Sequence, residues 1–106
     1  MNKFIVILCT ISSQDEAKRI AKEIVKKRLA ACVNIFEGIT SIYEWKGEIC
    51  TDNECLMIIK TKEELFDEIK REIVALHPYE IPEIISLAVK DGLESYLNWI
   101  KENTIN

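Results

Sequence analysis

The sequence contains few of the residues that metal-rich, disulfide-bonded or disordered proteins need. It has one histidine, two prolines, three glycines and four cysteines among 106 residues. A single histidine excludes a His-rich metal site within one chain, and the low glycine and proline content, with 48% apolar residues, is not typical of disorder. A folded chain of this length buries about two-thirds of the surface that it exposes when unfolded. We therefore expect a single domain over residues 1–106 that folds without disulfides.

Charge and hydropathy narrow the possible partners. The net charge of -4 gives no basic surface of the kind that binds nucleic acid. No apolar run approaches the roughly 20 residues of a membrane span, and residues 1–18 lack the length and cleavage site of a secretory signal. The cysteines form no CxxC pair and no zinc-finger spacing, so we expect free thiols in a cytoplasmic protein without nucleic-acid or membrane partners. They are Cys9, Cys32, Cys50 and Cys55.

The first half of the chain predicts a strand, a helix and a long hairpin. Residues 4–11 are continuously apolar and β-branched, which is typical of a central strand. Residues 13–16, Ser-Gln-Asp-Glu, fit a capping box, and the apolar spacing that follows predicts a helix from about Asp15 to Arg28. Residues 31–61 alternate loosely on both sides of Lys46-Gly47, which suits the tight turn of a hairpin.

The second half predicts a helix, a strand and a short C-terminal helix. Residues 61–64, Thr-Lys-Glu-Glu, fit a second capping box and predict that a helix begins there. Pro78 cannot continue a helix, so this helix is expected to end near His77. Residues 83–91 predict a fourth strand, and residues 93–100 predict a short amphipathic helix. The inner face of the first of these helices is expected to carry Leu65, Ile69, Ile73 and Leu76.

The order of these elements, β-α-β-β-α-β-α, favours a ferredoxin-like α+β fold. Two split β-α-β units with right-handed crossovers place both long helices on one face of a four-stranded antiparallel sheet. The other face is then uncovered, and hairpin strands of up to about 14 residues, against the usual 5 or 6, must project beyond the sheet or bend. Large exposed apolar surfaces usually mark interfaces, so we expect an oligomer.

Five segments, in their order and spacing, closely resemble the CutA divalent-cation tolerance family over nearly the whole chain. The segments are RLAACVNI (28–35), SIYEWKGEI (41–49), LMIIKT (56–61), HPYEIPEII (77–85) and YLNWI (96–100). The resemblance implies a ferredoxin-like subunit in a tight homotrimer built by the long hairpin, with links to copper and other divalent cations. It implies no established reaction, so we expect a binding protein and not an enzyme.

Residues that match the family's motifs include four candidate metal ligands, which are Cys32, His77, Glu80 and Glu83. A thiolate and an imidazole are good donors for copper and carboxylates are poorer ones, so copper is the expected ion. In a trimer, Cys32 of one chain can approach His77 of another at a subunit cleft. The alternative interpretation is that His77 caps the C-terminus of a helix and the glutamates bond backbone amides.

A second hypothesis is a trimeric signalling protein that senses a small metabolite in clefts between subunits and acts through a protein partner. The family's trimer resembles that of nitrogen-regulatory signal proteins, which is an analogy of fold only. Aromatic side chains are more often interface anchors than a ligand cage, but with a cation they suit a small anionic ligand. The candidate cleft residues are Tyr43, Trp45, Lys60, Tyr79 and Trp99. Two further hypotheses are a Cys-His nucleophile at Cys32, for which the sequence offers no oxyanion-hole glycines and no third residue to orient the base, and a purely structural trimer.

Overall fold

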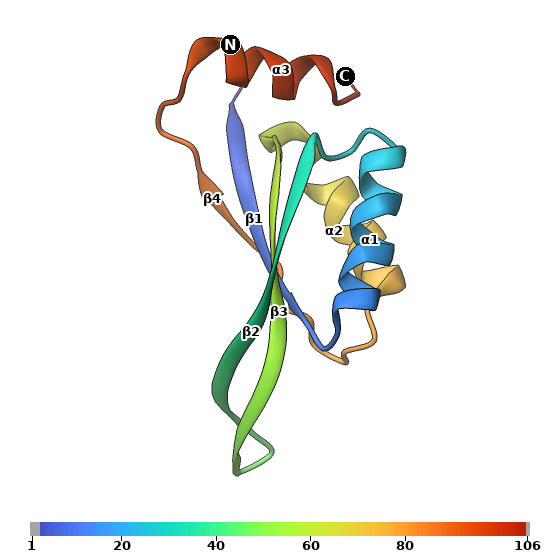
Figure 1. The fold of residues 1–106 in the computed structure, drawn as a ribbon, viewed down its shortest axis with the longest axis vertical. Coiled ribbons are helices and arrows are strands. Elements are labelled where there is room, and N and C mark those ends of the chain that lie inside the picture. Colours follow the sequence, from blue (N-terminus) through green and yellow to red (C-terminus); the bar gives the residue numbers. More distant parts are fainter. Residues whose placement is uncertain (1–2, 106) are drawn as a thin grey trace.

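The computed structural model describes residues 3–105 as a mixed α+β fold built on one four-stranded antiparallel sheet. The elements are β1 (Phe4–Ile11), α1 (Gln14–Lys26), β2 (Cys32–Trp45), β3 (Glu48–Lys62), a 3-10 turn η1 (Glu63–Leu65), α2 (Phe66–Leu76), β4 (Ile85–Ala88) and α3 (Glu94–Glu102). The strand order is β2-β3-β1-β4, and α1 and α2 lie on the same side of the sheet (Figure 1). The predicted ferredoxin-like fold is therefore confirmed.

The alternation of side chains along β1 separates the two faces of the sheet. Ile5, Ile7, Cys9 and Ile11 are buried, and they form the core together with α1, α2 and β3. The helices contribute Ile20, Ile24, Ile69 and Ile73 to this core, and β3 contributes Met57 and Ile59. The intervening residues of β1 point to the opposite face and are only half-buried. The core thus lies on one side of the sheet.

The opposite face of the sheet lacks a covering layer along most of its length in a single chain. Leu8 and Ile58 are half-buried there, while Phe36, Ile85 and Leu87 are each 50% exposed. α3 lies across the end of the sheet at which β1 begins (Figure 1). The expected uncovered face is therefore present in the single chain.

No helix within residues 3–105 is long and apolar enough to span a membrane.

α1 begins as its capping box predicts and ends slightly earlier than expected. The Ser13 hydroxyl accepts a hydrogen bond from the backbone N–H of Glu16 at 3.2 Å, and the helix runs over Gln14–Lys26. Arg28 has a left-handed backbone, with φ of 60°. The N–H of Arg28 donates to the carbonyl of Val25, and the N–H of Leu29 donates to the carbonyl of Ile24. This is a Schellman ending, so the helix stops before Arg28.

The second predicted capping box is wrong. β3 continues to Lys62 because its pairing with β1 extends to Phe4↔Lys62, which holds Thr61 in an extended conformation. The Thr61 hydroxyl donates to the carbonyl of Leu29 at 2.6 Å and caps no helix. The chain then makes the turn η1, and α2 begins at Phe66 without a side-chain cap. Leu65, Ile69 and Ile73 are nevertheless buried as predicted.

The hairpin of β2 and β3 projects well beyond the sheet (Figure 1). Its strands have 14 and 15 residues, and the pairing reaches Trp45↔Glu48 around the turn. Lys46 and Gly47 both have positive φ, 51° and 83°, as a tight hairpin turn requires. A register shift between Phe36 and Ile39 marks a bulge near the point where the hairpin leaves the sheet. The predicted overhang is confirmed.

The segment from His77 to β4 is a loop followed by a short strand. His77 has an extended backbone, with ψ of 136°, so α2 ends where Pro78 predicts. β4 covers only Ile85–Ala88 and not the predicted residues 83–91, because its pairing with β1 runs from Leu8↔Ile85 to Ile5↔Ala88. The residues before β4 therefore remain free of the sheet.

Candidate functional site

A groove opens where the hairpin leaves the sheet. It has a volume of about 820 Å³ and is lined by the projecting hairpin and by the loop before β4. The hairpin contributes Tyr43, Trp45, Asp52 and Glu54, and the loop contributes Tyr79, Glu80 and Glu83. The groove thus brings together five of the nine site residues predicted from the sequence.

The lining of this groove is acidic. It carries the carboxylates of Asp52, Glu54, Glu80 and Glu83, and none of the described residues in the lining is a lysine, arginine or histidine. Hydroxyl groups, including that of Thr10, supply further oxygen atoms. An anionic ligand would be repelled by this lining, so the geometry disfavours the anionic ligand considered in the sequence hypothesis.

Sequence reasoning missed Asp52 and Glu54. Residues two apart on a strand share a face, and the turn at Lys46-Gly47 sets Asp52 opposite Ser41. This pairing was available from the turn alone. The same register sets Glu54 opposite Ile39, and the bulge near Gly38 changes the register only beyond that pair, at Phe36↔Leu56.

His77 links β1 to the groove and is itself buried, with 8% of its surface exposed. Its Nδ1 accepts a hydrogen bond from the backbone N–H of Tyr79 at 3.1 Å, so Nε2 carries the proton and donates to the carbonyl of Thr10 at 2.8 Å. The rings of His77 and Tyr79 meet edge to face, with their centroids 4.6 Å apart. Both ring nitrogens are therefore engaged within the chain, and His77 holds the Tyr79 ring in place.

The four predicted metal ligands do not converge within one chain. Cys32 pairs with Lys60, which in turn pairs with Val6 of β1. His77 instead bonds the carbonyl of Thr10, which is four residues, or roughly 13 Å, from Val6 along β1. Residues 3–105 contain no group of three or more His, Cys, Asp or Glu side chains placed to hold a metal ion. A metal site or a Cys-His pair built from these residues thus needs more than one chain.

Lys60 and Trp99 lie away from the groove, because Trp99 belongs to α3 and Lys60 lies beside that helix. The Lys60 ammonium is 5.9 Å from the centroid of the Tyr96 ring, which stacks on Trp99 with a centroid separation of 5.6 Å. Tyr96 and Trp99 are about 40% exposed. The predicted ligand cleft is thus divided between two ends of the sheet.

The two phenols of the groove have raised pKa values, for different main reasons. The hydrogen bond from the Tyr43 hydroxyl to Asp52 is the main reason that the pKa of Tyr43 rises to about 12. Burial is the main reason that the pKa of Tyr79 rises, and the hydrogen bond from its hydroxyl to Glu54 Oε2, at 2.6 Å, adds to the effect. Both phenols are therefore neutral hydrogen-bond donors near neutral pH.

The two buried thiols are not activated nucleophiles. Burial raises the pKa of Cys9 to about 12, and the charges of Glu83 and Glu54 add smaller contributions. Burial likewise raises the pKa of Cys55. All four cysteines are free. Thiolate is the reactive form, so Cys9 and Cys55 are not activated, while the hypothesis of nucleophilic catalysis concerned Cys32.

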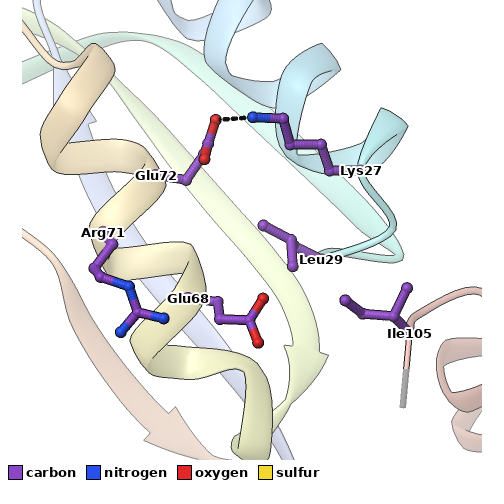
Figure 2. Close-up of a pocket in the computed structure, with 6 residues that line it drawn as sticks. All are labelled: Lys27, Leu29, Glu68, Arg71, Glu72 and Ile105. Carbon is purple, nitrogen blue, oxygen red and sulfur yellow. Dashed lines mark hydrogen bonds and ion pairs between the residues drawn. The ribbon is translucent and has the colours of Figure 1, made fainter.

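A second, smaller hollow of about 340 Å³ lies between α1, α2 and the C-terminal segment. Figure 2 shows the Lys27 ammonium pointing at the Glu72 carboxylate, and the two groups are 2.5 Å apart. Glu68 and Arg71 lie nearer the start of α2. Leu29 and Ile105 form its apolar side (Figure 2). The charges in this hollow are mixed, and it contains none of the predicted site residues.

Comparison with known proteins points to one family. Residues 5–103 match the family described as CutA1 divalent ion tolerance protein. The divalent-cation tolerance protein CutA of Thermus thermophilus is 48% identical over 99 residues, which cover 93% of this chain and 96% of that protein. Human protein CutA is 47% identical over 95 residues, which cover 90% of this chain and 53% of that protein. The chain thus spans about half the length of its plant and mammalian relatives, 53 to 56%.

Solved structures agree with the sequence comparison. The crystal structure of CutA1 from Oryza sativa superposes with a TM-score of 0.95 at 44% identity, covering 97% of this chain and 94% of that chain. The divalent cation tolerance protein from Thermus thermophilus superposes with a TM-score of 0.92 at 47% identity, covering 98% of this chain and 99% of that chain. The matched residues include the sheet, the hairpin and the three helices. The chain therefore belongs to the CutA1 divalent ion tolerance protein family.

Proposed function

We propose that this protein is a homotrimer that binds copper or another divalent metal ion and acts in the cell's response to metal, without catalysing a reaction. Family membership supports a role in tolerance of divalent cations.

The observation that carries the assembly is the presence of two exposed apolar surfaces. Phe36 and Leu87 are half exposed on the uncovered sheet face, and Ile42 and Ile49 are 70% and 73% exposed on the other side of the strands, in the projecting hairpin. Apolar patches of this kind on soluble proteins usually mark interfaces. Further copies of the same chain would cover both surfaces.

The metal ligands of the proposed site come from different subunits, because one chain brings no three of them together. Cys32 is the most suitable of the predicted ligands. It is half-buried and pairs with Lys60, so it lies on the uncovered face. A thiolate is a soft ligand and favours copper, particularly Cu(I). Assembly through the uncovered face would bring copies of Cys32 into one interface, whereas His77 would first have to release Thr10 or Tyr79.

Native mass spectrometry of the reduced protein, titrated with copper, tests this proposal. We expect a trimer that saturates with one or three ions, because three equivalent chains offer one shared site or three identical sites. Cys32→Ser should abolish the saturable uptake. Cys50→Ser, which removes another half-exposed thiol from the hairpin, should leave it unchanged. A monomer would contradict the assembly, and uptake that Cys32→Ser leaves intact would contradict the assigned ligand.

The groove supports the second candidate, a trimeric signalling protein that senses a small metabolite and passes the signal to a protein partner. Its volume, about 820 Å³, is within the usual range of ligand pockets, and it has three aromatic side chains and several polar groups. A ligand that binds only the folded state raises the unfolding temperature. A metabolite screen by thermal unfolding, with Tyr79→Phe as the comparison, would separate this function from metal binding. A screen without any shift would count against it.

A further inference from the structure

The turn that ends α1 contains a residue in an unfavourable backbone conformation. Arg28 has φ of 60°, in the left-handed region, which is costly for a residue with a Cβ atom. Glycine is the usual residue at this position of a Schellman ending, because it adopts a positive φ without strain. A contact of the Arg28 side chain outside the turn would offset this cost.

Arg28 makes such a contact with the end of α3. Its guanidinium donates to the carbonyl of Glu102, the last residue of that helix, at 2.5 Å. Its own carbonyl accepts a hydrogen bond from the N–H of Ile105 at 2.9 Å. The last carbonyls of a helix carry partial negative charge, so a guanidinium is favourable there. Arg28 thus joins the end of α1 to the end of α3, although 74 residues separate it from Glu102.

Lys62, the last residue of β3, is a second anchor for the same segment. Only 2% of its surface is exposed, and its ammonium donates to the carbonyl of Ile105 at 2.6 Å. A buried ammonium is costly unless acceptors compensate it, so the position of Ile105 matters to the end of β3. The Thr104 hydroxyl, also buried, donates to the carbonyl of Ile100 at 2.9 Å. Residues 103–105, which we call the C-terminal strap, are therefore held from both sides.

The helix that this strap fixes lies next to Cys32. Cys32 pairs with Lys60, and directly opposite residues of antiparallel strands point to the same face of the sheet. α3 lies across this end of the sheet (Figure 1), and the Lys60 ammonium is 5.9 Å from the centroid of the Tyr96 ring on α3. All these contacts lie within one chain, so any covering of this end by other subunits would be added to them.

We propose that the C-terminal strap, anchored by Arg28 and Lys62, holds α3 beside Cys32 and limits access to the Cys32 thiol. Release of the strap would let α3 move away from the sheet and open this end of β2. Arg28 and Lys62 are positioning residues in this arrangement. The importance of the strap for copper uptake rests on the proposed role of Cys32 as a metal ligand, whereas the strap itself does not.

Hydrogen exchange and alkylation by iodoacetamide, measured on the reduced assembled protein without copper, test the proposal. Arg28→Gly suits the turn but removes the guanidinium. We expect the amide protons of α3 and the alkylation of Cys32 to react about fivefold faster or more, because a charge-assisted hydrogen bond is lost. Exchange that is unchanged or slower would mean that Arg28 serves the turn alone, which would overturn the proposal.

Lys62→Met is the second variant. It keeps an apolar side chain in the buried position and removes the bond to Ile105. Replacing a buried charge by an apolar group often leaves the overall stability unchanged, so a local effect on α3 stays measurable. The amide protons of α3 and the Cys32 thiol should again react faster. Wild-type rates at both would overturn the role of Lys62 as an anchor.

The matched control is Arg19→Gln, which removes a guanidinium bond of 2.9 Å to the carbonyl of Leu76, at the end of α2. It should change the exchange of α3 and the alkylation of Cys32 by less than about twofold, because the lost contact is exposed and lies elsewhere. The buried thiol of Cys9 reports global unfolding. Equal acceleration at Cys9 and Cys32 would mean a general loss of stability and would overturn the proposal, as would faster exchange in α3 with unchanged alkylation of Cys32.

Discussion

At the scale of single residues, His77 connects the helical layer to the groove. Its ring bridges the carbonyl of Thr10 on β1 and the N–H of Tyr79 in the loop, and Tyr79 in turn reaches Glu54 on β3. Three segments that are distant in sequence therefore meet through one imidazole and one phenol. The helix-capping interpretation of His77 located the helix end correctly but did not predict these contacts.

His77→Ala should lower the free energy of unfolding by about 2 to 4 kcal/mol, because two buried hydrogen bonds and an aromatic contact are lost. His77→Asn should lower the free energy of unfolding by a smaller amount, because the asparagine side-chain oxygen can replace Nδ1 as the acceptor for the Tyr79 N–H. Urea unfolding at a fixed protein concentration measures both. Equal losses in the two variants would mean that packing of the ring, and not the bond to Tyr79, fixes the loop.

Tyr43 gives a prediction at alkaline pH. Its pKa is about 12 in the folded chain and about 10 in the unfolded chain, so between these values the folded chain holds the proton more tightly. The stability that the bond to Asp52 contributes is complete below about pH 10 and is lost as the pH rises towards about 12. Urea midpoints from about pH 9 to about pH 11.5 should therefore fall less steeply in Tyr43→Phe than in the wild type. Parallel profiles would contradict this linkage.

At the scale of the elements, two similar sequence patterns had different outcomes. The box that begins at Ser13 caps α1, whereas the one that begins at Thr61 lies in a strand. The difference is tertiary, because β1 pairs with β3 as far as Lys62 and its ladder outweighs the local signal. The helix stop at Pro78 and the turn at Lys46-Gly47 were predictable because each depends on local backbone geometry and not on pairing with a distant strand.

The hairpin turn offers a test of element stability. Lys46 has φ of 51°, which is unfavourable for lysine and more favourable for asparagine. Lys46→Asn should raise the free energy of unfolding by up to about 1 kcal/mol. The loss of the exposed contact between the Lys46 ammonium and the Trp45 ring reduces this gain slightly. Gly47→Ala, at φ of 83°, should lower it by about 1 kcal/mol. Thermal unfolding measures both, and changes of the same sign would contradict the assignment of the turn.

At the scale of the whole molecule, the sheet separates the predicted site residues. Tyr43, Trp45 and Tyr79 meet at the hairpin end, whereas Trp99 lies on α3 and Lys60 lies beside that helix. Their types and motifs were readable from the sequence, but their grouping depends on strand register and on the bulge between Phe36 and Ile39. The trimer, the protein partner and the cytoplasmic location stay predictions.

The uncovered face gives the prediction at this scale. Phe36→Lys places a charge on that face and should yield a species close to the chain mass of 12.3 kDa in light scattering. Val74→Lys, at a side chain that is 55% exposed on α2, is the matched control and should leave the assembly intact. Circular dichroism would show whether Phe36→Lys still folds. An assembled Phe36→Lys variant would place the interface elsewhere.

The length of the hairpin has a consequence for how the protein responds to dilution. A two-stranded ribbon without a covering layer is only marginally stable in water, and the projecting part of β2 and β3 has no helix over it. In the proposed trimer, contacts with neighbouring chains would stabilise this part of the hairpin. The fraction of chains with an ordered hairpin would then depend on protein concentration through the trimer equilibrium. Amide protons near the turn should then exchange faster as the protein is diluted, while those of β1 should not. Local folding at the tip of one chain would thus depend on how many others are present.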